Sequence, residues 1–226
     1  LTDRVHTSER FASGVALFIL GFAKKVLLAN PIGAVADTAF GAQALDTPAA
    51  WFGVLAYAFQ IYFDFCGYSD MAVGLGRLFG FEFMKNFDSP YCAESITDFW
   101  RRWHISLSTF LRDYLYIPLG GNRGSTVRTY ANLAIVMLLG GLWHGANWTF
   151  IVWGAYHGAW LIAERWAGRQ PFYRALPSPV RIAATFVLVL GSWVWFRADS
   201  LPAALGYFRA MLGGGSPNDT TALLGA

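Results

Sequence analysis

The chain has 226 residues, of which 55% are apolar, 17% aromatic and 14% charged. Ordinary soluble domains carry about 25% charged residues, so the composition excludes a disordered chain and a freely soluble protein. Its 17 basic and 14 acidic residues leave a net charge of +3, too small to predict a nucleic-acid partner. We therefore expect an all-α, polytopic integral membrane protein in contact with lipid.

Apolar runs predict the membrane segments in chain order. Residues 11–28 form the first run, and residues 51–66 form a strong candidate span, which we expect to end at Asp64 and a polar break over 67–70. Lys24 and Lys25, inside the first run, are expected to extend toward an interface. The later runs are 71–83, which is rich in glycine, 130–143, 148–163, 182–196 and the shorter, amphipathic 201–212.

The segment 85–128 is basic and polar, unlike the apolar runs around it. Ser95 and Asp98 have the spacing of a capping box that opens a helix. From Ile96 to Tyr114 the large apolar residues recur at helical spacing. The pattern predicts one amphipathic helix at the membrane interface.

The basic segments 85–128 and 165–181 are both expected on the cytoplasmic side, because positive charge concentrates there. Between them lie only the runs 130–143 and 148–163. A helix over 130–143 extends about 21 Å, less than the hydrocarbon core of ~30 Å. We therefore predict a short re-entrant hairpin with residues 144–147 at its apex inside the membrane, although two distorted full spans remain an alternative.

Two histidines are candidates for chemistry from the residues alone. His144 is an ionisable side chain at predicted membrane depth, where such groups are functional candidates, and burial favours the neutral imidazole that a general base requires. A histidine that bonds across helices would fit the same pattern equally well. His104 fits an interfacial histidine on the amphipathic helix, and His157 fits a packing histidine bonded to a neighbouring carbonyl.

Motifs for several other chemistries are missing. The sequence has no HExxH and no His, Cys or Asp set at ligand spacing, so no metal site is predicted. It also has no nucleophile elbow, phosphate-binding loop or dinucleotide fingerprint, and no resident cofactor is expected.

Three strings resemble one family closely. They are Asp-Phe-Trp-Arg-Arg-Trp-His-Ile-Ser at 98–106, Tyr-Ile-Pro-Leu-Gly-Gly-Asn at 116–122 and Leu-Trp-His-Gly-Ala-Asn at 142–147. They resemble the membrane-bound O-acyltransferase (MBOAT) family, in particular its bacterial alginate O-acetyltransferase type. The resemblance extends from about residue 14 to residue 197. It predicts that residues 1–226 are a single membrane domain of this family, with some of the family's N-terminal spans missing.

The resemblance implies an O-acyltransferase. His144 falls on the family's invariant histidine and would be the base in acyl transfer from a thioester, and His104 falls on its second position. The implied donor is cytoplasmic acetyl-CoA, and the implied acceptor system is an exported polysaccharide such as alginate, with extracytoplasmic modification partners at the bacterial inner membrane. Acylation of peptidoglycan and D-alanylation of teichoic acid are alternatives, and a transporter is a rival of another class.

Five further residues are candidates for substrate contacts. Asn147 and the Trp143 indole lie next to His144 in sequence and could donate to the developing oxyanion. Arg101 and Arg102 could attract the phosphates of a nucleotide-bearing donor, or could be ordinary cytoplasmic anchors. Asp70 could line a polar path or pair with a nearby basic residue.

Overall fold

The computed structural model describes residues 4–42, 44–168 and 170–215. Over these residues the chain forms helices and no strand, which confirms the predicted all-α class. The chain divides into two compact units, one of Leu1–Asn86 with Arg209–Ala226 and the other of Phe87–Phe208. The expectation of a single membrane domain over 1–226 stays a prediction.

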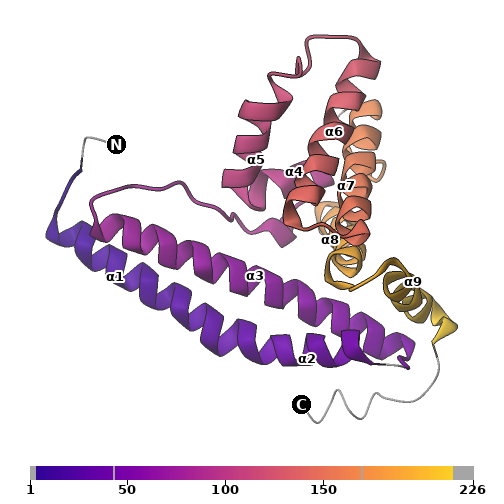
Figure 1. Ribbon diagram of the computed structural model, residues 1–226, viewed down its shortest axis with the longest axis horizontal. Helices are drawn as coiled ribbons and strands as arrows, with labels where there is room; N and C mark the ends of the chain where they lie inside the picture. The colour runs from indigo at the N-terminus through magenta and orange to yellow at the C-terminus, as the bar shows by residue number, and fades with distance from the viewer. Residues whose placement is uncertain (1–3, 43, 169, 216–226) are drawn as a thin grey trace. The chain divides into compact units, whose positions relative to one another are not determined.

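The first unit is built on a long helical pair (Figure 1). Its helices are α1 (Ser8–Ala23), the π-helical η1 (Lys24–Ala29), α2 (Asn30–Gly41), α3 (Thr47–Leu78) and the short η4 (Ala210–Gly214). The first three join end to end and lie side by side with α3. The contact is close because a Cβ added at Gly21 would lie 2.4 Å from the Gly67 carbonyl oxygen. Small residues at such contacts are typical of helices that pack in membranes.

The predicted end of the second span at residues 67–70 is wrong, because α3 continues through them as one helix of 32 residues. Its two carboxylates find partners on η1: Asp70 lies 2.5 Å from the Lys24 ammonium, and Asp64 lies 2.6 Å from that of Lys25. Each carboxylate therefore has an ion-pair partner within the helical pair, and the helix does not need to end for its charge to be compensated. From the sequence we expected the side chains of Lys24 and Lys25 to extend toward a membrane interface. In the structure, both form ion pairs with carboxylates of α3.

The second unit holds the segments that resemble the family motifs. Its helices are η2 (Pro90–Cys92), α4 (Ile96–Arg102), α5 (Ile105–Leu111), η3 (Arg112–Tyr116), α6 (Thr126–His144), α7 (Trp148–Trp166), α8 (Ser178–Arg197) and α9 (Leu201–Arg209), whose last residue falls in the first unit. The Ser95 hydroxyl accepts a hydrogen bond of 2.9 Å from the Asp98 amide, which confirms the predicted helix start.

The single amphipathic helix predicted over 96–114 is wrong. The chain breaks between α4 and α5, where His104 adopts a left-handed backbone conformation with φ of 46°. An unbroken helix would need a right-handed conformation at this residue. The apolar spacing continues across the break, so the pattern gave no sign of it.

In the part of the chain that the structure describes, three segments are long and apolar enough to cross a membrane: Ser8–Gly41, Thr47–Leu78 and Ser178–Arg197. Helices α6 and α7 have 19 residues each and are not among them. They lie side by side (Figure 1), joined by residues 145–147, and a Cβ added at Gly154 would lie 2.3 Å from the Met137 carbonyl oxygen. The turn after His144 is thus confirmed, whereas its re-entry into a membrane stays a prediction.

Candidate functional site

His144 is the last residue of α6 and lies in an aromatic cluster. Its half-buried ring meets the edges or faces of Trp153 and Phe196 at centroid distances of 5.2 Å and 5.1 Å, nearly at right angles. Within the described residues, neither ring nitrogen of His144 has a hydrogen-bond partner. Aromatic walls around an uncommitted imidazole suit a base that must stay neutral until a substrate hydroxyl arrives.

His104 approaches the same cluster from the break between α4 and α5. Its ring centroid lies 6.4 Å from that of Trp143, which in turn lies 4.9 Å from that of His144. Burial lowers the pKa of His104 to about 4, and the nearby His144 adds to the effect. The structure thus brings to one indole two histidines that are separated by 40 positions in the sequence.

Helix α4 is held in place by its aromatic residues. The ring of Phe99 stacks on that of His157 at 6.0 Å, and the Trp100 indole donates a hydrogen bond of 3.2 Å to Nδ1 of His157. His157, on α7, is completely buried. Its expected role in packing fits this environment, but the expected carbonyl partner is wrong, because the indole N–H supplies the bond.

Glu164 is an important residue of this region that the sequence reasoning missed. Its carboxylate, on α7, is 1% exposed and accepts hydrogen bonds from the backbone amides of Ile96 and Thr97, at 2.7 and 2.9 Å. These amides open α4, where a helix has unpaired N–H groups and attracts negative charge. The available signal was that Glu164 is the only acidic residue between Asp113 and Asp199.

The two predicted oxyanion donors differ in their availability. Asn147 caps α7, accepting from the Thr149 amide at 3.2 Å, and its amide nitrogen donates to the Asp199 carbonyl at 2.9 Å. One amide N–H therefore remains for a substrate. Trp143 is 65% exposed and has both histidine rings near its own ring.

The predicted charged residues fall into two groups. Asp70, in the first unit, is paired with Lys24, which is the second of the two alternatives for it. Arg102 is bonded to Asp98 at 3.0 Å, so its charge is already compensated. Arg101 is exposed and has no ion-pair partner among the described residues. In the same part of the chain, no three His, Cys, Asp or Glu side chains gather as metal ligands.

Comparison with known proteins shows which proteins the chain resembles. The family model described as MBOAT, membrane-bound O-acyltransferase family, matches residues 5–190. The chain is 56% identical over 213 residues to the "Probable alginate O-acetylase AlgI" of Pseudomonas aeruginosa, a match that covers 94% of this chain and 41% of the relative.

Two further relatives carry other names. The "Peptidoglycan O-acetyltransferase" of Helicobacter pylori is 46% identical, with 91% of this chain and 40% of the relative covered. The "Teichoic acid D-alanyltransferase" of Streptococcus thermophilus is 36% identical, with 72% of this chain and 42% of the relative covered. The chain thus spans about two fifths of the length of these relatives. The matched range includes all three motif strings and most of the chain, and the chain belongs to the membrane-bound O-acyltransferase family.

Proposed function

We propose that the protein containing this chain transfers an acetyl group from acetyl-CoA on the cytoplasmic side toward an exported polysaccharide, with alginate as the favoured acceptor. The observation that carries the proposal is the approach of His104 and His144 to the same indole, with ring centroids 6.4 and 4.9 Å from that of Trp143. Among the three relatives named above, the alginate O-acetylase has the highest identity, which favours alginate over peptidoglycan or teichoic acid.

In the proposed reaction, His144 removes the proton of an acceptor hydroxyl as its oxygen attacks the thioester carbonyl. The tetrahedral intermediate collapses, the carbon–sulfur bond breaks, and the thiolate takes the proton from the histidine. The Trp143 indole and the remaining N–H of Asn147 are candidate donors to the oxyanion. His104 orients the acyl group beside His144.

This activity places the protein in the bacterial inner membrane, where a cytoplasmic donor and an extracytoplasmic polymer are both within reach. Polysaccharide-modifying partners outside the membrane would complete the transfer to the polymer. The three segments that are long and apolar enough to span a bilayer support this location.

The test is polysaccharide O-acetylation in cells that express the full-length protein with His144→Ala at wild-type membrane levels. We expect acetylation to fall at least about a hundredfold, since general-base catalysis contributes about 10²–10⁴-fold. His6→Ala is the matched control, because His6 is an exposed histidine of the first unit and should leave acetylation unchanged. Undiminished acetylation in His144→Ala would refute the assignment of the base and favour the transporter alternative.

A further inference from the structure

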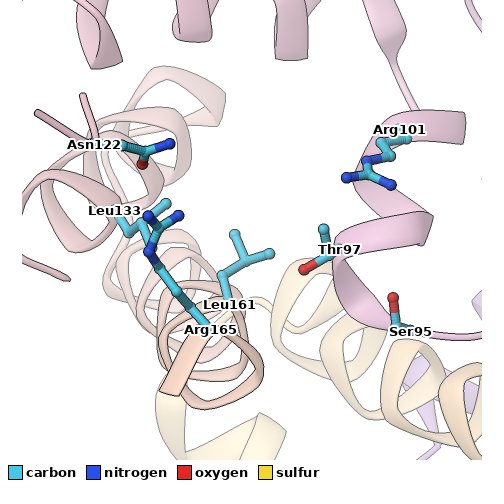
Figure 2. Close-up of a pocket in the computed structure, with 7 residues that line it drawn as sticks. All are labelled: Ser95, Thr97, Arg101, Asn122, Leu133, Leu161 and Arg165. Carbon is cyan, nitrogen blue, oxygen red and sulfur yellow. The ribbon is translucent and has the colours of Figure 1, made fainter. Parts of the chain in front are cut away.

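A cavity of about 290 Å³ lies in the second unit between α4 and the α6–α7 pair (Figure 2). Ser95, Thr97 and Arg101 line its α4 side, and Asn122 and Arg165 face them together with two leucines. The guanidinium of Arg101 points into the open space. The cavity is at the small end of ligand sites, which measure about 300–1,000 Å³, so it suits a compact group or one end of a larger ligand.

The charged side chains that line this cavity are all cationic. No carboxylate lines it, and within the described residues neither Arg101 nor Arg165 has an ion-pair partner. An adjacent cavity of about 330 Å³ shares Ser95 and Arg101 but also contains Glu94 and Asp98. There the acids pair with arginines, Glu94 with Arg181 and Asp98 with Arg102. Only the first of these two cavities thus has a lining that is cationic without acidic residues.

The polar groups that line the cavity are donors. The Tyr116 hydroxyl donates to Oδ1 of Asn122 at 2.5 Å, which leaves the amide NH₂ of that residue to donate. The Ser95 oxygen accepts from the Asp98 amide, and its own hydrogen is still available. The Thr97 hydroxyl adds a third neutral donor. Two guanidinium forks with neutral donors around them match the oxygens of a phosphate group.

The two walls are also held in a set geometry. The carboxylate of Glu164 bonds to the amides of Ile96 and Thr97, so α4 is joined to α7 directly beside Arg165. Because this carboxylate already occupies the N-terminus of α4, the helix end itself is not the site. The arginine side chains remain as the groups that would meet a ligand.

We propose that this cavity binds a phosphate-bearing group: either the phosphates of the acyl donor or the headgroup of an anionic phospholipid. In its donor form the inference rests on the proposed acetyl transfer, and in its lipid form it does not. The donor carries its phosphates and its thioester at opposite ends of a long arm. Along α7, the 17 steps from Trp148, close after His144, to Arg165 correspond to about 26 Å, so the two ends of the donor would be bound far apart.

The experiment uses the full-length protein in phosphatidylcholine nanodiscs, with coenzyme A and phosphate-free pantetheine as probes. We expect Arg101→Gln and Arg165→Gln each to weaken coenzyme A binding at least about tenfold, with pantetheine binding unchanged. The control is Arg112→Gln, which removes the same charge from an exposed residue that is bonded to Asp113 and does not line the cavity.

A second arm identifies a lipid source. The same variants are reconstituted with mixed phosphatidylglycerol and phosphatidylcholine, and retained phosphatidylglycerol is counted by native mass spectrometry. Loss of that lipid from both cavity variants, with coenzyme A binding intact, would support the phospholipid form. If neither probe responds to either substitution, the site is refuted. None of these readouts requires turnover, so they are independent of the His144→Ala test of the proposed function.

Discussion

His104 is one of two non-glycine residues in the described part of the chain with a positive φ, the other being Ser89. A residue held in this region costs about 1–3 kcal/mol and persists only where its surroundings impose it. Here the surroundings are the packed residues before it, with Phe99 of α4 and Trp103 just after α4 both buried. With this backbone conformation, the imidazole ring of His104 lies 6.4 Å from that of Trp143. The residue proposed to orient the acyl group therefore lowers the stability of the fold locally.

Replacing His104 separates strain from chemistry. His104→Gly should make the full-length protein more stable than His104→Ala by about 1 kcal/mol, because glycine adopts a positive φ without steric cost. Both variants should lower O-acetylation by a similar factor, since both lose the ring. Thermal unfolding of the purified protein in detergent, together with the acetylation assay, measures the two effects. Equal stability of the two variants would show that no backbone strain resides at this position.

Glu94 lies outside the candidate membrane-spanning segments and makes a pH-dependent contact with the first turn of α8. A hydrogen bond from Ser178 and the Arg181 guanidinium at 2.5 Å lower the pKa of this carboxyl from its ordinary value of 4.5. A depressed folded-state pKa means that the contact adds stability above pH 4.5 and that this contribution disappears as the pH falls through the folded-state value.

We therefore expect wild-type protein to be more stable than Glu94→Gln at pH 7, with the difference shrinking from about pH 4.5 downward. Unfolding temperatures of the two full-length proteins, compared from pH 7 to pH 3, provide the measurement. A difference that stays constant over this range would mean that the ionised carboxylate does not stabilise the fold.

At the scale of elements, α4 connects the two proposed binding regions. It begins at the cavity, where Glu164 bonds to its first amides, and it ends next to His104. Between these points it is packed on α7 through Phe99 and Trp100. Any loosening of its N-terminal end should therefore affect both the cavity and the position of the histidine.

Glu164→Ala tests this connection. The buried amide of Ile96 and the partly buried amide of Thr97 would lose their acceptor. We expect a loss of about 1–3 kcal/mol in the free energy of unfolding, faster hydrogen exchange at Ile96 and Thr97, and lower O-acetylation. Glu164→Gln keeps one acceptor oxygen and a similar shape, so its effects should be intermediate. If Ala and Gln variants both matched the wild type, α4 would be held by its aromatic contacts alone.

Some helices were predicted correctly from the sequence and others were not, and the difference has a physical reason. The runs 148–163 and 182–196 correspond to α7 and α8, because a long apolar segment has few alternatives to a buried or lipid-facing helix. The continuation of α3 past Asp70 was missed because the partner of that carboxylate, Lys24, lies 46 positions away. The break at His104 was missed because the aromatic packing that imposes it comes from α7 and α8 as well as from α4.

In the candidate site, too, some residues could be found from the sequence and others could not. The histidines were found from motif and chemistry, and the structure brings them together at Trp143. Arg165 was identified only as part of a basic segment, and its place opposite Arg101 depends on the packing of α4 against α7. Local patterns thus locate the reactive groups, whereas the cavity around the arginines exists only in the packed structure.

At the scale of the molecule, the α6–α7 pair carries the proposed base at one end and an arginine of the proposed phosphate site at the other. Its turn carries His144, and the far end of α7 carries Arg165. Although each helix has 19 residues, α6 opens with Thr126–Thr129, which are polar except for Val127, so its apolar run still starts at Tyr130. The length of this run, about 21 Å, remains short of a ~30 Å hydrocarbon core.

We therefore expect the turn to stop inside the membrane. In the full-length protein, Arg128→Cys should react with an impermeant maleimide from the cytoplasmic side, whereas Ala146→Cys should react from neither side until detergent is added. Ala146 is exposed in this structure, so protection would come from the membrane or from the remainder of the protein. Labelling of Ala146→Cys from the periplasmic side would instead establish two full spans. The base would then lie at the outer surface, and the acetyl group, not the polymer, would have to cross the bilayer before His144 could act on it.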